Sequence, residues 1–333
     1  MKEYKVAVVI PTYNEELYIE NCIESVRSQS FPFEEMDVMI VDGRSTDGTR
    51  EIVQKMSELC PNIRLIDNPG KIQSIAFNIG VKNSSAPFVI RLDAHVSYDK
   101  HYIERCLYHL NRLSQIGDVG GICLTRTRRV GLIPEANAIV CQSRFGIGGA
   151  SFRVGAPAGF VDTVPFGAFP RHVIDKIGGM REDLERAEDN EYVSRIKKTG
   201  YKVYLDPDIV STYYARDSFK GLIKQMYANG VSIGQLFYVD CTAIGLRHFV
   251  PFAFLLSLFV SVIGAIFWKL FLWLLLIILC MYFLCAITAT IALCGKNGWK
   301  YFYILPILFF CVHCSYGWGI LIGLFKYAKQ YSK

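Results

Sequence analysis

Apolar and polar residues alternate in short blocks along the first hundred positions. Continuous apolar runs predict buried strands at 6–11, 36–42, 63–67 and 87–93. Between them, apolar residues at helical spacing predict helices at 15–29, 49–60 and 73–84. Continuously apolar strands that alternate with helices are typical of an α/β fold with a doubly wound, mostly parallel sheet. In such sheets, ligands bind at the carboxyl ends of the strands.

The pattern weakens between residues 121 and 170, which are rich in Gly, Arg and Pro. We interpret this stretch as irregular, functional loops. Regular patterns then return and predict helices at 171–177 and 188–198, a strand at 201–206 and an amphipathic helix at 217–236.

Three nearly uncharged segments follow, at 249–268, 270–294 and 301–325. Each is close to the ~20 residues that a membrane-spanning helix requires. A buried helix pair in a water-soluble protein is the alternative, but these segments have no polar face. The sequence therefore predicts a domain at 1–236, a membrane anchor of about three helices at 249–325 and a short basic tail at 326–333.

The charged residues around the anchor give conflicting indications of its topology. The first two segments are separated by little more than Trp268 and Lys269, which predicts a tight hairpin. Lysines lie beyond both ends of the third segment, and each group of lysines indicates that its end is cytoplasmic. Both ends cannot be cytoplasmic if the third segment spans the membrane. These lysines are Lys296, Lys300, Lys326, Lys329 and Lys333. The third segment contains Pro306 and His313. The sequence leaves three possibilities open for it: it crosses the membrane, it is re-entrant, or it packs against the other two segments.

The overall composition narrows the class of partner. The formal net charge of +6 fits contact with anionic lipid headgroups or phosphates. The basic residues are too dispersed to indicate nucleic acid as a partner. The 11 cysteines form no paired framework, which suits a reducing compartment where cysteine packs as a small hydrophobe.

Acidic residues follow two of the predicted strands. Asp42 ends the second strand, where a carboxylate can accept hydrogen bonds from a base or ribose. It could instead cap the next helix, but Ser45 or Asp47 can make that cap and leave Asp42 free. Asp93 and His95 close the fourth strand and can ligate one divalent ion beside a diphosphate, or simply form a surface turn. Imidazole favours Mn²⁺ slightly over Mg²⁺.

Glu188 and Asp189 begin a predicted helix. Acids in a first turn favour the helix macrodipole, so a structural role is sufficient to explain them. A carboxylate there could equally act as a general base that deprotonates a hydroxyl.

Several basic residues have two readings each. Lys71, in a loop, contacts a phosphate or is solvated. A second group contacts an anionic lipid-linked acceptor or lipid headgroups, or else is solvated. It consists of Arg126, Arg128 and Arg129. The residues that precede the first apolar segment suit a membrane interface. They are Arg216, Lys220 and Lys224.

Four motifs in order resemble glycosyltransferase family 2. They are VVIPTYNEE at 8–16, VMIVDGRSTDGT at 38–49, VIRLDAH at 89–95 and RAEDNEY at 186–192. The resemblance covers about residues 5–235 and implies the GT-A nucleotide-diphospho-sugar transferase fold, here followed by C-terminal transmembrane helices. RLDAH, PFGAFPR (165–171) and KQMYANG (224–230) are most similar to succinoglycan-type glucosyltransferases of bacterial exopolysaccharide synthesis.

The resemblance implies a role for each matching residue. Asp42 would bind the uracil of a UDP-sugar, and Asp189 would be the catalytic base of an inverting transfer. Asp93 would sit by the ribose and the divalent metal, Mn²⁺ or Mg²⁺, with His95 in place of the usual second aspartate. Residues that would line the nucleotide pocket are Pro11, Thr12, Tyr13 and Glu15.

The resemblance also implies the substrates. A hexosyltransferase of this kind would move a sugar, expected to be glucose, to a hydroxyl of an undecaprenyl-diphosphate-linked saccharide at the cell membrane. Its catalytic domain would be cytoplasmic, its anchor would be multi-pass, and other polysaccharide-assembly proteins would be partners. The Gln-x-x-Arg-Trp motif of processive members is not found, which favours one sugar per encounter. The alternative is a polyprenyl-phosphate glycosyltransferase that acts on the lipid phosphate itself.

Overall fold

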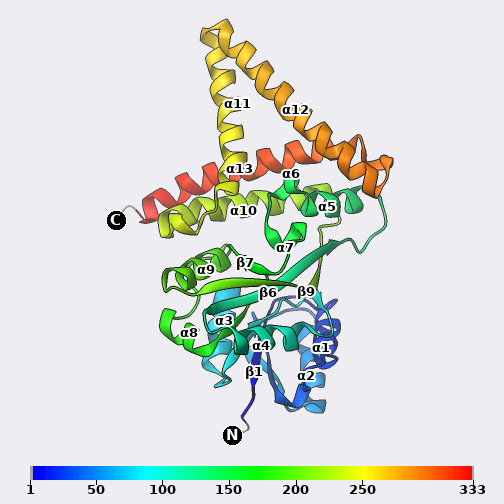
Figure 1. Ribbon diagram of the computed structural model, residues 1–333, viewed down its shortest axis with the longest axis vertical. Coiled ribbons are helices and arrows are strands. Elements are labelled where there is room, and N and C mark those ends of the chain that lie inside the picture. Colours follow the sequence, from blue (N-terminus) through cyan, green and yellow to red (C-terminus); the bar gives the residue numbers. More distant parts are fainter. Residues whose placement is uncertain (1–2, 332–333) are drawn as a thin grey trace. The chain divides into compact units, whose positions relative to one another are not determined.

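The computed structural model describes residues 3–331, which form two compact units (Figure 1). The first, called the sheet unit, contains Met1–Leu124 and Ser151–Tyr213. The second, called the helical unit, contains Thr125–Ala150 and Tyr214–Lys333. The domain boundary predicted at residue 236 differs from this division, because 125–150 and the helix after Tyr214 belong to the helical unit.

The strands of the described chain form one mixed sheet. Four of them pair in parallel, in the order β3 (Ile63–Asp67), β2 (Met36–Asp42), β1 (Val6–Thr12) and β4 (Phe88–Arg91). The sheet continues through β8 (Ala168–Pro170), β6 (Ile116–Arg126), β9 (Lys202–Tyr214) and β5 (Val96–Tyr98). β7 (Gly159–Val161) pairs with β9. The doubly wound parallel half is confirmed, whereas the pairs β4–β8, β6–β8, β5–β9 and β7–β9 are antiparallel.

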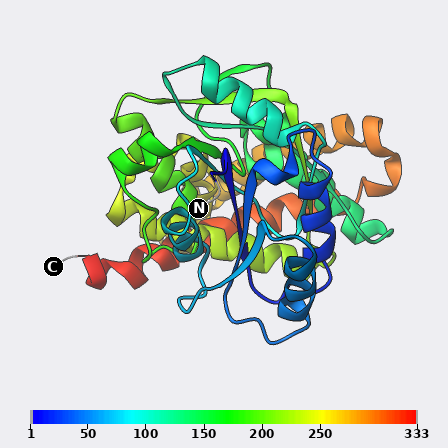
Figure 2. The ribbon, with the colours of Figure 1, turned by 90° about the horizontal axis from the view of Figure 1, so that it is seen from below.

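Alternate residues of β1 face opposite layers of helices. Val6, Val8 and Ile10 pack toward α1 (Ile19–Arg27). Ala7 and Val9 pack toward α3 (Gln73–Lys82). The first layer also contains α2 (Thr49–Leu59) and α4 (Tyr102–Arg112), and the second contains α8 (Arg171–Ile177) and α9 (Glu188–Lys198). Seen from below, β1 lies in the interior with helices on both sides (Figure 2).

The prediction of irregular loops at 121–170 is wrong. The stretch contains the end of β6, then α5 (Leu132–Gln142), α6 (Arg144–Ile147), α7 (Ser151–Val154), β7 and β8. Periodicity fails as a guide here because residues 136–141 of α5 are all buried, and because β7 and β8 have only three residues each.

In the helical unit, α10 (Phe219–Val239) runs parallel to α13 (Ile304–Tyr331). Gly230 packs on Gly319 and Gly234 on Gly323, so closely that a Cβ on Gly230 would lie 2.2 Å from the carbonyl oxygen of Tyr316. This small-xxx-small pairing lets two helix backbones touch.

The predicted hairpin of the first two apolar segments is confirmed. It consists of α11 (Phe249–Phe267) and α12 (Lys269–Asn297), which leave the α10/α13 pair at a steep angle (Figure 1). Short 3₁₀ turns at Cys241–Ala243, Leu246–His248 and Trp299–Tyr301 join the long helices. By length and composition, α11 with the turn before it, α12 and α13 are each capable of crossing a membrane.

The third apolar segment packs against its neighbours, one of the options that the sequence left open. His313 of α13 lies 2.8 Å from the Tyr282 hydroxyl through Nδ1 and 2.7 Å from the Phe145 carbonyl through Nε2. Both ring nitrogens are therefore engaged in packing α13 against α12 and α6.

Candidate active site

Hydrogen bonds join the loop after β1 to the loop after β2. The Asn14 amide donates to Ser45 Oγ at 2.8 Å, and the Thr46 amide donates to Asn14 Oδ1 at 2.8 Å. The Glu15 amide donates to Thr49 Oγ1 at 2.8 Å. These bonds hold two strand-end loops, 32 residues apart in sequence, as one rigid rim at the carboxyl edge of the sheet.

Several residues with strained backbone conformations lie in or near this rim. Five non-glycine residues in the described chain have a positive φ, namely Asn14, Arg44, Lys71, Phe166 and Ala187. The first three lie in the loops after β1, β2 and β3, and Ala187 directly precedes Glu188 and Asp189. Such conformations cost about 1–3 kcal/mol each and concentrate at functional sites.

Asp42 is not the free carboxylate that the sequence predicted. It is fully buried, and it accepts hydrogen bonds from the Ser45 amide and hydroxyl and from Arg50 Nη1 at 2.6 Å. Arg50 Nη2 also reaches Asp67 at 2.8 Å. The Thr49 amide at the start of α2 donates to Asp47 Oδ1 at 3.1 Å, and the N-cap residue of that helix is Gly48. The pair with Arg50 is what makes the buried charge of Asp42 tolerable.

Two of the residues predicted to bind nucleotide, Tyr13 and Lys71, meet near Asp42. The Tyr13 ring is 45% exposed, and the Lys71 ammonium lies 5.5 Å from its centroid. A Cβ at Gly43 would touch both the Tyr13 ring and the Lys71 backbone at 3.3–3.4 Å. An exposed aromatic face beside a cation and a close backbone suits a base and a phosphate. Pro11 and Thr12 are instead buried within β1.

Asp93 and His95 turn to different partners. His95 Nδ1 lies 3.0 Å from Glu15 Oε1, whereas Asp93 Oδ1 lies 3.3 Å from Arg91 Nη2. Tyr98 fixes the turn, since its hydroxyl accepts from the Asp93 amide at 2.7 Å. The predicted ligands Asp93 and His95 thus both follow β4, and Glu15 lies beside His95.

Arg91 links Asp93, which follows β4, to the acidic residues at the start of α9. Its Nη1 donates to Glu188 Oε1 at 3.0 Å, across 97 residues of sequence. Burial acts to lower the pKa of Arg91, but the carboxylates of Asp93, Glu188 and Asp189 raise it overall. Burial raises the pKa of the Glu188 carboxyl, against the influence of Arg91. The guanidinium therefore stays charged and fixes Asp93 and the start of α9 together.

Asp189 is the exposed member of this acidic cluster. Its carboxylate accepts the Asn190 amide at 2.8 Å and is close enough to affect Arg91, Glu188 and Asp118 electrostatically. Asp118 is buried, and burial first and Asp189 second raise the pKa of its carboxyl well above the usual range. Asp189 is therefore the solvent-facing carboxylate of the cluster, whereas Glu188 and Asp118 are buried.

The donor set around Asp93 fits a divalent ion. Carboxylates of Glu15 and Asp93 and the imidazole of His95 are ligands that Mn²⁺ and Mg²⁺ accept. Several acids surround a single buried arginine, so the cluster attracts a cation. Among the described residues, no three His, Cys, Asp or Glu side chains are grouped closely enough to hold a metal ion.

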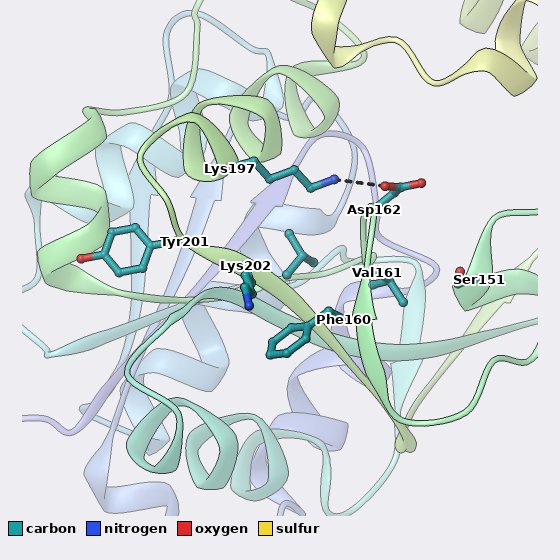
Figure 3. Close-up of a pocket in the computed structure, with 8 residues that line it drawn as sticks. Ser151, Phe160, Val161, Asp162, Lys197, Tyr201 and Lys202 are labelled. Atoms are coloured by element: carbon teal, nitrogen blue, oxygen red, sulfur yellow. Dashed lines mark hydrogen bonds and ion pairs between the residues drawn. The ribbon is translucent and has the colours of Figure 1, made fainter.

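A surface hollow of about 480 Å³ lies near the other end of α9 and contains none of the predicted site residues (Figure 3). Lys197 is paired there with Asp162 at 3.3 Å, and the Lys202 ammonium lies 4.6 Å from the Phe160 ring centroid. Both lysines that line the hollow therefore already contact other groups of the protein.

Sequence reasoning missed Arg91, Tyr98 and Arg50 as site residues. Arg91 lies within the motif VIRLDAH that contains Asp93, and Tyr98 follows that motif by three residues, so their spacing gave a signal. Arg50 gave none, because its partner Asp42 is eight residues away and their contact depends on the bend of the loop after β2.

The sequence profile described as glycosyl transferase family 2 matches residues 7–156. Two curated relatives are similar over longer stretches. The succinoglycan biosynthesis protein ExoA of Rhizobium meliloti (strain 1021) is 31% identical over 248 residues, 74% of each chain. A dolichyl N-acetyl-alpha-D-glucosaminyl phosphate 3-beta-D-2,3-diacetamido-2,3-dideoxy-beta-D-glucuronosyltransferase of Methanococcus voltae is 28% identical over 328 residues, 96% of this chain and 97% of the relative.

Solved structures share the fold. The mannosyltransferase PcManGT of Pyrobaculum calidifontis, in complex with GDP-Man and Mn²⁺, aligns over 98% of this chain and 88% of its own, with a TM-score of 0.63 and 18% identity. S. aureus TarS 1–349, in complex with UDP-GlcNAc, aligns over 74% of this chain and 72% of its own, with a TM-score of 0.52 and 19% identity.

Proposed function

The chain belongs to glycosyl transferase family 2, and we propose that it is an inverting enzyme that moves a sugar from a UDP-sugar to a hydroxyl of a lipid-linked saccharide at a membrane. That it is a glycosyltransferase follows from the family. The donor, the acceptor and the roles of individual residues are the proposal.

One observation carries the proposed chemistry: Arg91 contacts both Asp93 and Glu188. Asp93 is expected to bind the donor diphosphate through a metal, and Glu188 is next to the expected base. One guanidinium therefore contacts both residues. Transfer requires this proximity, because the acceptor hydroxyl has to meet the anomeric carbon while the diphosphate is held on the other side.

The nucleotide is proposed to bind over the rim of the sheet unit. The exposed ring of Tyr13 and the ammonium of Lys71 would meet the base and the phosphates, with Glu15 beside them. Asp42 would receive the uracil, which requires the partly exposed Arg50 to move off its carboxylate. The fold neighbours carry UDP-GlcNAc in one case and GDP-Man in the other, so the choice of UDP depends on this pocket.

The proposed reaction is a single displacement. Asp189 removes the proton of the acceptor hydroxyl, and the resulting oxygen attacks the anomeric carbon. The bond from that carbon to the diphosphate oxygen breaks, the electron pair leaves with UDP, and the proton on Asp189 passes to water. A divalent ion held by Asp93 and His95 would neutralise the charge of the departing diphosphate. Arg91 keeps the start of α9, and with it Asp189, in register with Asp93.

A saccharide acceptor is favoured over the lipid phosphate itself by the relatives. The Methanococcus voltae enzyme is named for transfer to the 3-position of a sugar already linked to dolichyl phosphate, and ExoA is named for succinoglycan synthesis. Undecaprenyl diphosphate as the lipid, glucose as the sugar and the cytoplasmic side of the cell membrane as the location complete the proposal.

A donor and acceptor matrix tests the proposal. The purified full-length protein is incubated with Mn²⁺ and a panel of UDP- and GDP-sugars, and nucleotide release is measured with polyprenyl-diphosphate-linked sugar, with polyprenyl phosphate and with no acceptor. We expect release with UDP-sugars that requires the lipid-linked sugar. Equal release with polyprenyl phosphate would favour transfer to the lipid phosphate, and release only with GDP-sugars would overturn the assignment of the nucleotide.

A further inference from the structure

The three apolar helices of the helical unit differ in how far they are exposed. The candidate span that includes α11 is 11% buried, that of α12 is 6% buried, and that of α13 is 39% buried with the lowest mean hydropathy, 1.8. α13 is covered by α10, through Gly319 on Gly230 and Gly323 on Gly234. The first two helices are therefore free to contact lipid on nearly all sides, and α13 is not.

α13 cannot take a position in a membrane independently of α10. α10 is not among the candidate spans, and it carries the polar residues Lys220, Lys224, Gln225, Asn229 and Gln235. The two helices are parallel, and a hairpin that crosses twice returns the chain to the side where α10 ended. α13 then starts on the side where α10 ended. If α10 and α13 both crossed the bilayer in parallel, α13 would instead have to start on the side where α10 began. Both helices therefore remain on one side of the bilayer.

Charge follows the same division. Between residues 249 and 295, Lys269 at the tip of the hairpin is the one charged residue. The other 13 Lys and Arg of the helical unit precede or follow that stretch. A strong excess of cations on one side of a hairpin is the signature of the cytoplasmic face. At the tip, Trp268 and Trp273 are each 64% exposed beside Lys269, as expected of residues at a far interface.

The base of the hairpin carries exposed apolar side chains among the cations. Val130 lies beside Arg128 and Arg129 in the loop before α5, and it is 95% exposed. Glu135 of α5 contacts Lys300 at 2.6 Å, which ties this loop to the turn after α12. Other exposed apolar residues near the ends of the helices are Leu246, Trp299, Tyr303 and Phe325. Apolar tips among cations suit a headgroup region with anionic phosphates.

The first helix of the hairpin also has the length of one bilayer. The 19 residues of α11 rise about 28 Å, against a hydrocarbon core of about 30 Å. A helix of this length brings Trp268 to the far interface when Phe249 is at the near one.

We propose that the helical unit is a two-crossing anchor on an anionic leaflet. α11 and α12 cross the bilayer, whereas α10, α13 and the loop 126–132 lie in the headgroup region of one leaflet. Both ends of the chain are then on the same side of the membrane. This inference rests on the membrane anchoring that forms part of the proposed function, and it resolves the conflict between the lysines around the third apolar segment.

Reporter fusions test the number of crossings. Full-length protein is expressed in bacteria with green fluorescent protein or alkaline phosphatase at the N-terminus, after Lys333, or inserted between Trp268 and Lys269. We expect the two terminal fusions to report the same side and the tip fusion the opposite side. Terminal fusions on opposite sides would show an odd number of crossings and overturn the proposal. Extraction of the wild type by alkaline carbonate would instead contradict anchoring itself.

Lipid composition tests the leaflet. The thermal midpoint of the full-length protein is measured in nanodiscs of phosphatidylcholine with and without phosphatidylglycerol. We expect the anionic lipid to raise the midpoint of the wild type, and the variant R128Q/R129Q/K220Q/K224Q to lose most of that rise. The matched control R105Q/R112Q removes cations from α4 of the sheet unit and should keep it. No response of the wild type would remove the anionic leaflet from the proposal.

Discussion

The two units of the chain carry opposite charge. The sheet unit has 22 Lys and Arg against 27 Asp and Glu, a formal charge of −5, whereas the helical unit has 14 against three, a formal charge of +11. Together they give the modest +6 of the whole chain. The overall charge therefore conceals two regions that are suited to different ligands.

The difference matters because each unit concentrates its charge at one place. In the sheet unit, Asp93, Glu188 and Asp189 gather around Arg91, where we propose the metal ion and the catalytic base to lie. In the helical unit, the cations lie outside the apolar hairpin, where lipid phosphates would meet them. Variants that change one unit should leave the function of the other intact, and the following predictions test that separation.

The largest effect is expected from Asp189→Asn. The amide cannot accept the proton of the acceptor hydroxyl, so kcat should fall about 10³-fold while UDP binding is kept. Transfer kinetics and calorimetric UDP titration measure the two effects. Asp183→Asn is the matched control, because Asp183 is an exposed acid paired with Arg181 a few residues earlier. Near wild-type turnover of Asp189→Asn would exclude it as the base.

Arg91→Lys should rank second. Lysine keeps the charge but cannot donate to Asp93 and Glu188 in the same fork geometry. Displacement of Asp189 relative to the donor should lower kcat about 10²-fold, with a smaller change in the donor KM.

The control for this variant is Arg64→Lys, which alters a comparable pair with Asp37, at 2.7 Å, on β3 and β2. If both variants lose activity equally, the effect of Arg91 is general stability and not positioning.

Asp93→Ala should weaken Mn²⁺-dependent UDP binding by about ten-fold or more, because a ligand of the ion is lost. The affinity for UDP is measured with and without Mn²⁺, and Asp99→Ala serves as the control outside the cluster. Identical affinities of wild type and Asp93→Ala under both conditions would remove Asp93 from the metal site.

Gly319→Ile tests the helical unit alone. A side chain there would meet the Tyr227 carbonyl oxygen of α10 at 2.2 Å, and such overpacking costs about 1–3 kcal/mol. The thermal midpoint should fall by several degrees. Gly295→Ile is the control, because a Cβ at Gly295 meets nothing within 4 Å. Equal midpoints for the two variants would contradict the close α10/α13 pairing.

The smallest effect is expected from Glu135→Gln. Hydrogen bonds from Lys300 and then Tyr301 lower the pKa of Glu135 to about 2. A lowered pKa stabilises the fold above the unfolded value of about 4.3, and this contribution is lost as the pH falls toward 2. The wild type should therefore melt slightly above the variant at neutral pH, with a difference that vanishes in acid. A difference that grows in acid would contradict the ion pair.

The parallel half of the fold and its strand-end acids could be predicted because each depends on local pattern. Continuous apolar runs marked β1, β2 and β4, and Asp42 and Asp93 follow directly from where such runs end. The boundary between the units could not be predicted, because α5 is joined to the anchor by contacts such as Glu135–Lys300, which are 165 residues apart.

The state of each site residue was also beyond the sequence. Asp42 has the right place in the chain, but only the folded loop reveals that Arg50 occupies its carboxylate. The glycines of 230–234 and 319–323 form recognisable small-xxx-small motifs, yet nothing in their spacing says that they pair with each other.

The stereochemistry of the product tests the central claim most directly. Proton NMR of the first product formed from an α-linked UDP-sugar and a lipid-linked acceptor reports the configuration at the new bond. A single displacement assisted by Asp189 predicts a β-linked product that inverts the donor. An α-linked product would require two displacements or a different mechanism, and it would contradict the proposed active site.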